Sequence, residues 1–314
     1  MQDQDVQRIV VIGAGHVGAT AAYALMLRGL FRQIVLIDSD PALAKAQAAD
    51  LADADALARP AQIWAGTYAD AAGAQIAVIT AGAATHGSET RLSVASRSAA
   101  IVRECATALC EHGFNGIILV AANPVDLMAM VAFEASNLPA AKVIGTGTLL
   151  DSARLRQALA THLGVAPTSI EAMVLGEHGD SEVALFSSAR IGGAPLATFP
   201  HAGKTLDTAQ IADDVRCAGY AIIEGKGYTS FGIATALVRI CEAIIRDERV
   251  VLPVSTQVAD VPGIGSIHIS RPCVIGASGV EQVVLPSVSE DEQRDLDASA
   301  RTIWAAWEEL ARNK

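Results

Sequence analysis

A histidine beside a glycine is the residue of this sequence best suited to move a proton. His178 lies in the segment Leu175-Gly-Glu-His-Gly-Asp-Ser181. An imidazole titrates near neutral pH, so it can both donate and accept a proton at a reacting oxygen atom. The glycine that follows it leaves room for another molecule to approach. A lone histidine in a loop is usually structural, so its role depends on which partners it has.

A carboxylate and a guanidinium lie three residues apart in Asp151-Ser-Ala-Arg154. Residues at this spacing share one face of a helix, and an ordinary surface ion pair is a common reason for such a pattern. This pair, however, follows Gly145-Thr-Gly-Thr148 at the end of a predicted strand, where binding sites form in open α/β sheets. Arginine can also bind a carboxylate with two parallel hydrogen bonds.

Three glycines near the start of the chain have the spacing of a dinucleotide site. Gly13, Gly15 and Gly18 follow an apolar run at 9–12 and precede a helical stretch at 19–30. In such a motif the first glycine permits a tight turn, the second lets the backbone approach a pyrophosphate, and the third allows the helix to pack closely. The free N–H groups at the helix start then face the phosphates. A tight turn without a ligand is the alternative for an isolated glycine triplet.

An acidic residue indicates which dinucleotide fits. Asp38 closes the apolar run at 34–37, twenty residues after Gly18. A carboxylate at this position accepts hydrogen bonds from ribose hydroxyls and repels a 2′-phosphate, and Ser39-Asp40 offers no arginine to reverse that preference. The sequence therefore favours NAD over NADP, although a solvated acid at a strand end would look the same.

Composition excludes several classes of protein. The 314 residues are 51% hydrophobic and carry a net charge of −11, which favours a globular chain and disfavours a nucleic-acid or anionic membrane surface. The acidic start Met-Gln-Asp-Gln-Asp lacks the features of a signal peptide, and no apolar run reaches roughly 18 residues. We therefore expect a cytoplasmic protein that does not enter a membrane.

Neither a disulfide framework nor a metal site is expected. The cysteines are odd in number and lack paired spacing, and they are Cys105, Cys110, Cys217, Cys241 and Cys273. The seven histidines are scattered, with no pair at helical ligand spacing.

The first half of the chain alternates short apolar strands with helices, a pattern typical of a doubly wound parallel sheet. The strands are expected near 8–12, 33–37, 61–65, 75–80, 116–121 and 142–145. The helices are expected near 16–30, 41–57, 92–111, 125–136 and 149–163. Gly82 and Asn123 fall at carboxyl ends of these strands, where ligands bind in such a sheet.

The second half predicts a mixed α+β arrangement. Strand-like segments at 170–175 and 183–191 precede helices at 208–225 and 229–247, a β region at 250–288 and a last helix. Apolar residues recur at helical spacing in the last two helices, which indicates core or subunit interface. We expect an α/β protein with a dinucleotide-binding domain over 1–146 and a substrate domain over 147–314.

The segment 81–91 contains small and polar residues punctuated by glycine, between a buried strand and a helix. Such a loop can close over a site, exclude water and deliver one functional side chain. An ordinary connection between strand and helix is the alternative, and this one is long for that purpose.

Seven motifs in order resemble the L-lactate and malate dehydrogenase family, and the likeness runs from about residue 8 to the C-terminal helix. They are Gly13-Ala-Gly-His-Val-Gly18, Thr80-Ala-Gly82, Glu89-Thr-Arg91-Leu92, Asn123-Pro-Val-Asp126, Gly145-Thr-Gly-Thr-Leu-Leu-Asp-Ser-Ala-Arg154, Gly176-Glu-His-Gly-Asp180 and Lys226-Gly-Tyr-Thr-Ser230. Together they are far more specific than the glycine triplet alone.

The resemblance implies an NAD-dependent oxidoreductase that transfers hydride between NADH and a small 2-keto acid to give the L-2-hydroxy acid. His178 would be the acid–base residue, and Asp151 would orient it. Arg154 would bind the substrate carboxylate, and Arg91 on the lid would polarise the substrate carbonyl.

The resemblance also assigns supporting positions. Asn123 would hydrogen-bond the substrate oxygen or the nicotinamide region, and Thr229 would line the pocket around the substrate side chain. The family further suggests a homodimer or homotetramer.

Two positions depart from the family pattern in the pocket. Thr85 occupies the lid position where lactate dehydrogenases resemble one another in carrying glutamine and malate dehydrogenases in carrying arginine. Gly219 stands where related enzymes resemble one another in carrying alanine. The expected order of substrates is therefore pyruvate and L-lactate first, bulkier neutral 2-keto acids second, and oxaloacetate and malate third. Neighbouring His86 would be only a weak substitute for the arginine that binds a second carboxylate. Thr85 filling space without reading the substrate remains an alternative.

A third departure concerns regulation. Arg156 and Glu171 match the arginine and histidine that bind fructose 1,6-bisphosphate in regulated bacterial relatives, and a carboxylate does not favour a phosphate. We therefore expect no such activation.

Two other classes of protein remain as alternatives. A non-catalytic NAD-binding sensor would not need the four residues Arg91, Asp151, Arg154 and His178 together. An NAD-dependent glycosidase would need a metal-binding Cys/His group, which the sequence lacks.

Overall fold

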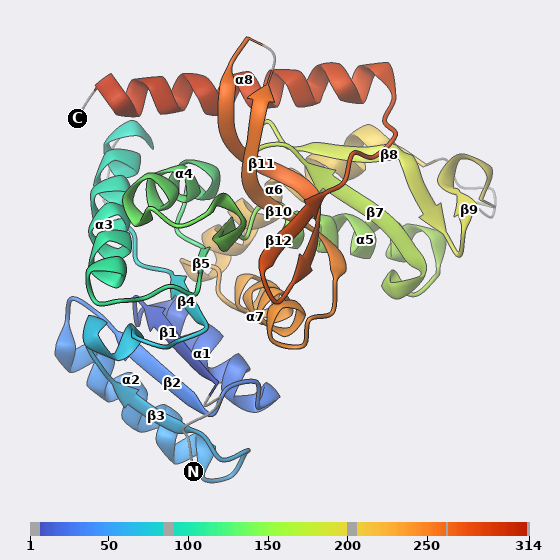
Figure 1. Ribbon diagram of the computed structural model, residues 1–314. Coiled ribbons are helices and arrows are strands. Elements are labelled where there is room, and N and C mark those ends of the chain that lie inside the picture. Colours follow the sequence, from blue (N-terminus) through green and yellow to red (C-terminus); the bar gives the residue numbers. More distant parts are fainter. Residues whose placement is uncertain (1–6, 84–90, 200–205, 262, 313–314) are drawn as a thin grey trace.

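The structure is a computed structural model that describes residues 7–83, 91–199, 206–261 and 263–312, apart from the side chains of residues 91, 92 and 260. Two sheets organise the described chain, and Figure 1 shows helices on both faces of the larger one. Segment 84–90, which holds Thr85, His86 and most of the expected lid, lies outside the described residues.

Nine strands form the large sheet in the order β12-β11-β10-β6-β5-β4-β1-β2-β3. Its parallel part consists of β1 (Arg8–Ile12), β2 (Gln33–Ile37), β3 (Gln62–Ala65), β4 (Ile76–Ile79), β5 (Ile117–Val120) and β6 (Val143–Gly145). Its antiparallel part consists of β10 (Val250–Val261), β11 (Gly265–Gly276) and β12 (Gly279–Val283). The order 3-2-1-4-5-6 is that of a doubly wound dinucleotide-binding sheet, so the expected fold class is confirmed.

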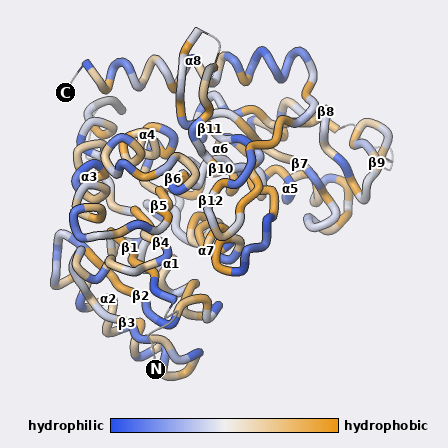
Figure 2. Tube along the Cα trace, viewed as in Figure 1, coloured by the Kyte–Doolittle hydropathy of each residue, from blue (hydrophilic) through white to orange (hydrophobic). Residues whose placement is uncertain are grey.

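Alternate side chains of the central strands pack against helices on opposite faces. Ile9 and Val11 of β1 belong to a core with α1 (His16–Arg28), α2 (Pro41–Asp55) and α7 (Phe231–Ile245). Val10 and Ile12 belong to a core with α3 (Arg91–Glu111), α4 (Val125–Ser136) and α8 (Glu290–Arg312). Figure 2 shows hydrophobic colour along these strands and along α7. This two-sided burial explains the continuous apolar runs of the sequence.

A smaller sheet follows the parallel strands. It has the order β7 (Ile170–Leu175), β8 (Val183–Ile191) and β9 (Ala194–Pro195), and α5 (Leu149–Leu163) and α6 (Thr208–Lys226) lie beside it. The described residues also form four short 3-10 helices, namely η1 (Tyr68–Ala71), η2 (Ala140–Lys142), η3 (Pro167–Ser169) and η4 (Leu196–Thr198). The short β9 and these turns are not among the expected elements.

The large sheet continues through the proposed boundary between domains. Gly145 of β6 pairs with Ser255 of β10, so antiparallel strands from the second half extend the parallel sheet of the first half. The division at residue 146 remains a prediction. The helices that the structure describes include none with the length and apolar character needed to cross a lipid bilayer.

Candidate active site

The glycine-rich turn has three positions with different steric needs. Gly13 has a φ of +99°, and a Cβ on it would lie 2.7 Å from the backbone nitrogen of Ala81. A Cβ on Gly18 would lie only 1.8 Å from the carbonyl oxygen of Gly13. A Cβ on Gly15, in contrast, would meet no atom within 4 Å. The geometry fits a tight turn, a close helix contact and an open approach for a pyrophosphate, in the order that the spacing predicts.

Asp38 and Thr80 hold this turn from the neighbouring strands. The Asp38 carboxylate accepts a hydrogen bond of 2.6 Å from the backbone N–H of Ala14 and one of 2.9 Å from that of Asp40. The hydroxyl of Thr80 donates to the carbonyl oxygen of Gly13 at 2.8 Å. Asp38 is only half-buried at the end of β2, so part of its carboxylate still faces solvent. Its assignment to a ribose remains a prediction.

Gly82 and Asn123 both lie beyond the carboxyl ends of adjacent strands, β4 and β5, and both are exposed. A Cβ on Gly82 would lie 3.5 Å from the Ala122 side chain, an ordinary contact, so packing alone does not require glycine there. The structure therefore places both residues at the expected edge of the sheet and leaves their roles untested.

A buried turn positions the first helical residues of α5. The hydroxyls of Thr148 and Ser152 both donate to the carbonyl oxygen of Val174 in β7, at 2.5 and 3.3 Å. Gly147 has a φ of +53°, and a Cβ on it would lie 2.5 Å from the backbone nitrogen of Ser255. These contacts fix Asp151 in the first turn of α5, where the helix dipole favours a negative charge.

Two helices hold the segment that carries His178. Its backbone N–H donates to the Asp126 carboxylate in α4 at 2.8 Å. The preceding N–H, that of Glu177, donates to the Ser299 hydroxyl in α8 at 2.8 Å. Asp126 ends the motif Asn123-Pro-Val-Asp126, and no role was predicted for it. Its contact with His178 spans 52 residues, so spacing alone did not reveal it.

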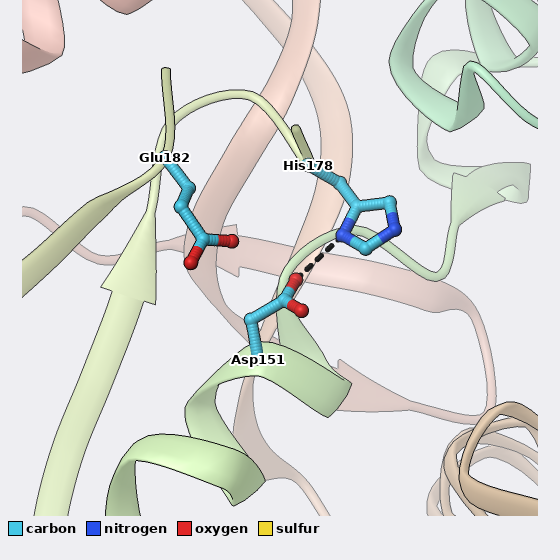
Figure 3. Close-up of side chains that lie close together, drawn as sticks. All are labelled: Asp151, His178 and Glu182. Carbon is cyan, nitrogen blue, oxygen red and sulfur yellow. Dashed lines mark hydrogen bonds and ion pairs between the residues drawn. The ribbon is translucent and has the colours of Figure 1, made fainter. Parts of the chain in front are cut away.

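Asp151 bridges the imidazole and the guanidinium. Nδ1 of His178 lies 2.5 Å from Oδ2 of Asp151, and Nη1 of Arg154 donates to Oδ1 of the same carboxylate at 2.9 Å. Figure 3 shows the imidazole with its other nitrogen turned away from Asp151. Asp151 is buried, whereas the His178 side chain keeps 27% of its surface exposed. One ring nitrogen is thus held by Asp151, and the other is not bound to that carboxylate.

Charge interactions overcome burial at this pair. Burial disfavours an ionised Asp151, but His178 and Arg154 hold the pKa of its carboxyl below the usual range. Burial also disfavours the imidazolium form of His178, yet the Asp151 carboxylate raises its pKa to about 9. At neutral pH the pair is therefore an imidazolium beside a carboxylate, and the imidazolium of His178 carries a proton that it can donate.

Glu182 is a site residue that the sequence reasoning missed. Its carboxyl group lies near Asp151 and His178 (Figure 3), and burial together with the Asp151 charge raises its pKa to about 8. It is four residues after His178, but only the turn between β7 and β8 brings its carboxyl group back to the pair. A protonated Glu182 leaves Asp151 as the charged carboxylate beside the imidazole.

One atom from each of Asp151, His178 and Glu182 could contact a common cation, since these atoms lie within 4.8 Å of one another. The carboxylate of Asp151 already pairs with His178 and Arg154. The expectation of no metal remains a prediction.

The two predicted pocket residues Gly219 and Thr229 lie in α6 and in the turn after it. A Cβ on Gly219 would lie 3.9 Å from Nη2 of Arg154, so this glycine borders the guanidinium. Thr229 is half-buried between α6 and α7. Arg91 is the first residue of α3. The sequence instead predicted Arg91 as the last residue of the lid segment, before a helix that begins near 92. The side chain of Arg91 lies outside the described part of the structure.

Family comparison divides the chain into two matched regions. Residues 7–145 match the family described as lactate/malate dehydrogenase, NAD binding domain. Residues 148–313 match the family described as lactate/malate dehydrogenase, alpha/beta C-terminal domain.

Individual relatives cover nearly the whole chain. The chain is 42% identical over 303 residues to an L-lactate dehydrogenase of Thermus aquaticus, covering 95% of this chain and 98% of that protein. It is 44% identical over 302 residues to one of Nitratidesulfovibrio vulgaris strain DP4, with the same coverage of 95% and 98%.

Solved structures agree with these relatives. A lactate dehydrogenase from a Medee basin deep-sea metagenome library superposes with a TM-score of 0.93 at 37% identity, covering 97% of this chain and 99% of that one. The minor L-lactate dehydrogenase of Enterococcus mundtii in its ligand-bound form also gives 0.93, at 35% identity, covering 96% of this chain and 98% of that one.

Proposed function

This chain belongs to the lactate/malate dehydrogenase family, and we propose that it interconverts a small 2-keto acid and the L-2-hydroxy acid, with pyruvate and L-lactate as the leading pair. It is an oxidoreductase, and its cofactor is NAD. The observation that carries the proposal is the chain of contacts from His178 through Asp151 to Arg154, which supplies a proton donor and a carboxylate binder at one place.

The turn after β1 fits the cofactor. Gly15 leaves open space beside the N-terminus of α1, and Asp38 stands at the end of β2 with part of its surface exposed. These residues would hold the pyrophosphate and the adenosine ribose of NAD. When bound, NADH supplies the hydride for the substrate carbonyl carbon. The Asp38 carboxylate disfavours the 2′-phosphate of NADP.

His178 is proposed as the proton donor for the substrate oxygen. Its Nδ1 is held by Asp151, so the proton leaves from Nε2 as the keto group becomes an alcohol, and the same nitrogen accepts the proton in the reverse reaction. Asp151 stabilises the imidazolium and fixes the direction in which the ring points. The Asp126 carboxylate supports the loop by accepting a hydrogen bond from the backbone N–H of His178.

Two arginines are proposed to bind the substrate, one at its carboxylate and one at its carbonyl oxygen. Arg154 uses one nitrogen on Asp151, which orients its planar group beside Gly219 for a substrate carboxylate. By resemblance to the family, Arg91 polarises the carbonyl, Asn123 hydrogen-bonds the same oxygen or the nicotinamide region, and Thr229 lines the pocket.

Side-chain preference follows from the two small pocket residues. Gly219 supplies no Cβ beside Arg154, which supports reduction of neutral 2-keto acids larger than pyruvate as a second activity. Each accommodated methylene changes binding by about 1 kcal/mol, enough to shift preference several-fold without excluding pyruvate. By resemblance to the family, Thr85 occupies the position where malate dehydrogenases carry arginine, which leaves a second carboxylate without that partner, so oxaloacetate ranks third.

An assay of NADH oxidation across 2-keto acids tests this proposal. We expect turnover of pyruvate and of 2-oxobutyrate, 2-oxoisocaproate or phenylpyruvate, and poor turnover of oxaloacetate. Dominant oxaloacetate turnover would assign the chain to malate instead. No NADH oxidation with any of them would favour the NAD-binding sensor.

Assembly and location are also proposed. Tyr220, Ile222 and Ile223 are exposed on α6, Tyr228 is exposed in the turn after it, and Phe231 is exposed at the start of α7. These side chains support a homodimer or homotetramer. The cytoplasmic location is proposed from the sequence alone. Sedimentation of the purified protein at micromolar concentration distinguishes these sizes from a monomer.

A further inference from the structure

Two aromatic rings from distant parts of the chain stack at the edge of the candidate site. The imidazole of His16 and the phenol ring of Tyr228 have centroids 3.8 Å apart and planes inclined by only 4°. His16 is the first residue of α1, directly after Gly15, and Tyr228 lies in the turn between α6 and α7. The stack therefore joins the cofactor-binding turn to the turn that carries Thr229.

Lys226 makes a second contact with the same phenol ring. Its Nζ lies 4.5 Å from the centroid of Tyr228 and 4.3 Å from that of Phe231. A cation over an aromatic face is attracted by the electron density of the ring. Tyr228 thus contacts both His16 and Lys226.

Hydrogen bonds contribute little to this turn. Gly227 ends α6 with a φ of 86°, and Ser230 caps α7 without a side-chain hydrogen bond. Among the described residues, no hydrogen bond involves Tyr228 or Thr229. In the absence of such bonds, the ring stack links the turn that carries Thr229 to the first turn of α1.

Loss of the stack should leave the helices themselves in place. α1 and α7 lie side by side in Figure 1 and share a buried core that includes Ala22, Leu25, Leu237 and Cys241. His16 and Tyr228 lie outside that core, at the N-terminal ends of the two helices. Substitution of either ring therefore changes the turn rather than the fold.

We propose that the His16–Tyr228 stack is a positioning element that fixes Thr229 against the cofactor-binding turn, so that the wall of the substrate pocket is set from the cofactor side. The proposal rests on the proposed function only in treating Thr229 as a pocket residue. An aligned aromatic pair is worth about 3- to 10-fold in an equilibrium constant. That factor is the expected loss when the stack is removed.

A double-mutant cycle with His16→Ala and Tyr228→Ala tests the proposal. At saturating NADH, each single variant should raise the KM for pyruvate about 3- to 10-fold and change kcat less than about twofold. The KM of the double variant should be no higher than that of the more impaired single variant, because both substitutions remove the same contact. Effects that multiply in the double variant, or an unchanged KM, would overturn the proposal.

Two further variants separate the stack from general disturbance. Tyr228→Phe keeps the stacked ring and should restore the KM of the original protein. Tyr23→Ala removes another exposed ring of α1 and should have no effect. A raised KM in Tyr228→Phe would assign the effect to the hydroxyl and contradict the stack.

Amide hydrogen exchange decides the matter independently of turnover. In the free protein, His16→Ala should speed exchange at residues 227–231 about 3- to 10-fold and leave the centre of α7 unchanged. Should the original protein reduce no 2-keto acid, the proposed function fails, yet faster exchange still supports the stack. Unchanged exchange at this turn contradicts the stack whether or not the protein is active.

Discussion

The Asp151 carboxylate shares its two oxygens between two different tasks. Oδ2 holds the imidazole of His178 and Oδ1 holds the guanidinium of Arg154, so one side chain orients both the proposed proton donor and the proposed carboxylate binder. This sharing explains how the carboxyl remains ionised although it is buried, since two cations offset the cost of desolvation. Loss of Asp151 should therefore affect proton transfer and substrate binding together.

The pH dependence of the reaction reports the role of Asp151. In the proposed mechanism, reduction of pyruvate needs protonated His178, whose pKa is about 9, so kcat/KM should fall as the pH rises through about 9. Asp151→Asn removes the charge that raises this pKa, and the alkaline fall should move down by at least about one pH unit. Measurement of kcat/KM from pH 6 to 10 checks this shift.

A surface carboxylate provides the control for that experiment. Asp213→Asn removes an exposed partner of Arg216 on α6 and should leave the alkaline fall where it is. The same profile in Asp151→Asn as in the original protein would mean that another group sets the protonation of His178.

At the scale of elements, the start of α1 separates steric from binding requirements. Gly18→Ala would place a Cβ within 1.8 Å of a carbonyl oxygen, so we expect loss of stability and of NADH binding. Gly15→Ala meets no protein atom within 4 Å and has an ordinary φ of −71°, so its melting temperature should stay nearly unchanged. Its NADH affinity should still fall, because the methyl group takes the space of the pyrophosphate.

Melting curves without cofactor and NADH titrations of both variants check the pair. Normal NADH affinity in Gly15→Ala would mean that the pyrophosphate does not lie beside Gly15.

The elements also show which features the sequence could predict. The glycine turn, Asp38 and the strand alternation depend on local spacing, and the structure has them near the expected positions. The contact of His178 with Asp126 and the return of Glu182 toward Asp151 depend on packing between distant segments. Spacing within one segment contains no such information. Helix ends differ by a few residues for the same reason, since caps and packing decide them.

At the scale of the whole molecule, the antiparallel part of the large sheet contains a buried titratable group. His268 of β11 is almost fully buried, its ring lies 5.5 Å from that of Phe133 in α4, and its Nε2 has no hydrogen-bond partner within the described chain. Burial lowers its pKa to about 3. The folded protein therefore requires the neutral imidazole at this position in β11.

Acid should weaken the fold through His268. The unfolded histidine has a pKa near about 6.5, so between pH 6.5 and 3 the unfolded state binds the extra proton. The contribution of neutral His268 is complete above pH 6.5 and is lost as the pH falls, by about 2 kcal/mol at pH 5. His268→Leu cannot titrate, so its stability should fall less between pH 7.5 and 5.

Urea unfolding of both proteins at the two pH values measures the difference. Parallel losses of stability would show that acid unfolds the protein through other groups.

The most direct test of the account is the turnover of His178→Asn with NADH and pyruvate. Its side chain is partly exposed and its loop is held by backbone contacts to Asp126 and Ser299, so the variant should fold and bind NADH as before. Without the proton donor, kcat should fall by about 10²- to 10⁴-fold. NADH affinity from fluorescence titration and kcat from NADH absorbance provide the two readings. Unchanged NADH binding with that loss of kcat is the predicted result, and turnover close to that of the original protein would contradict the assignment of His178 and with it the proposed mechanism.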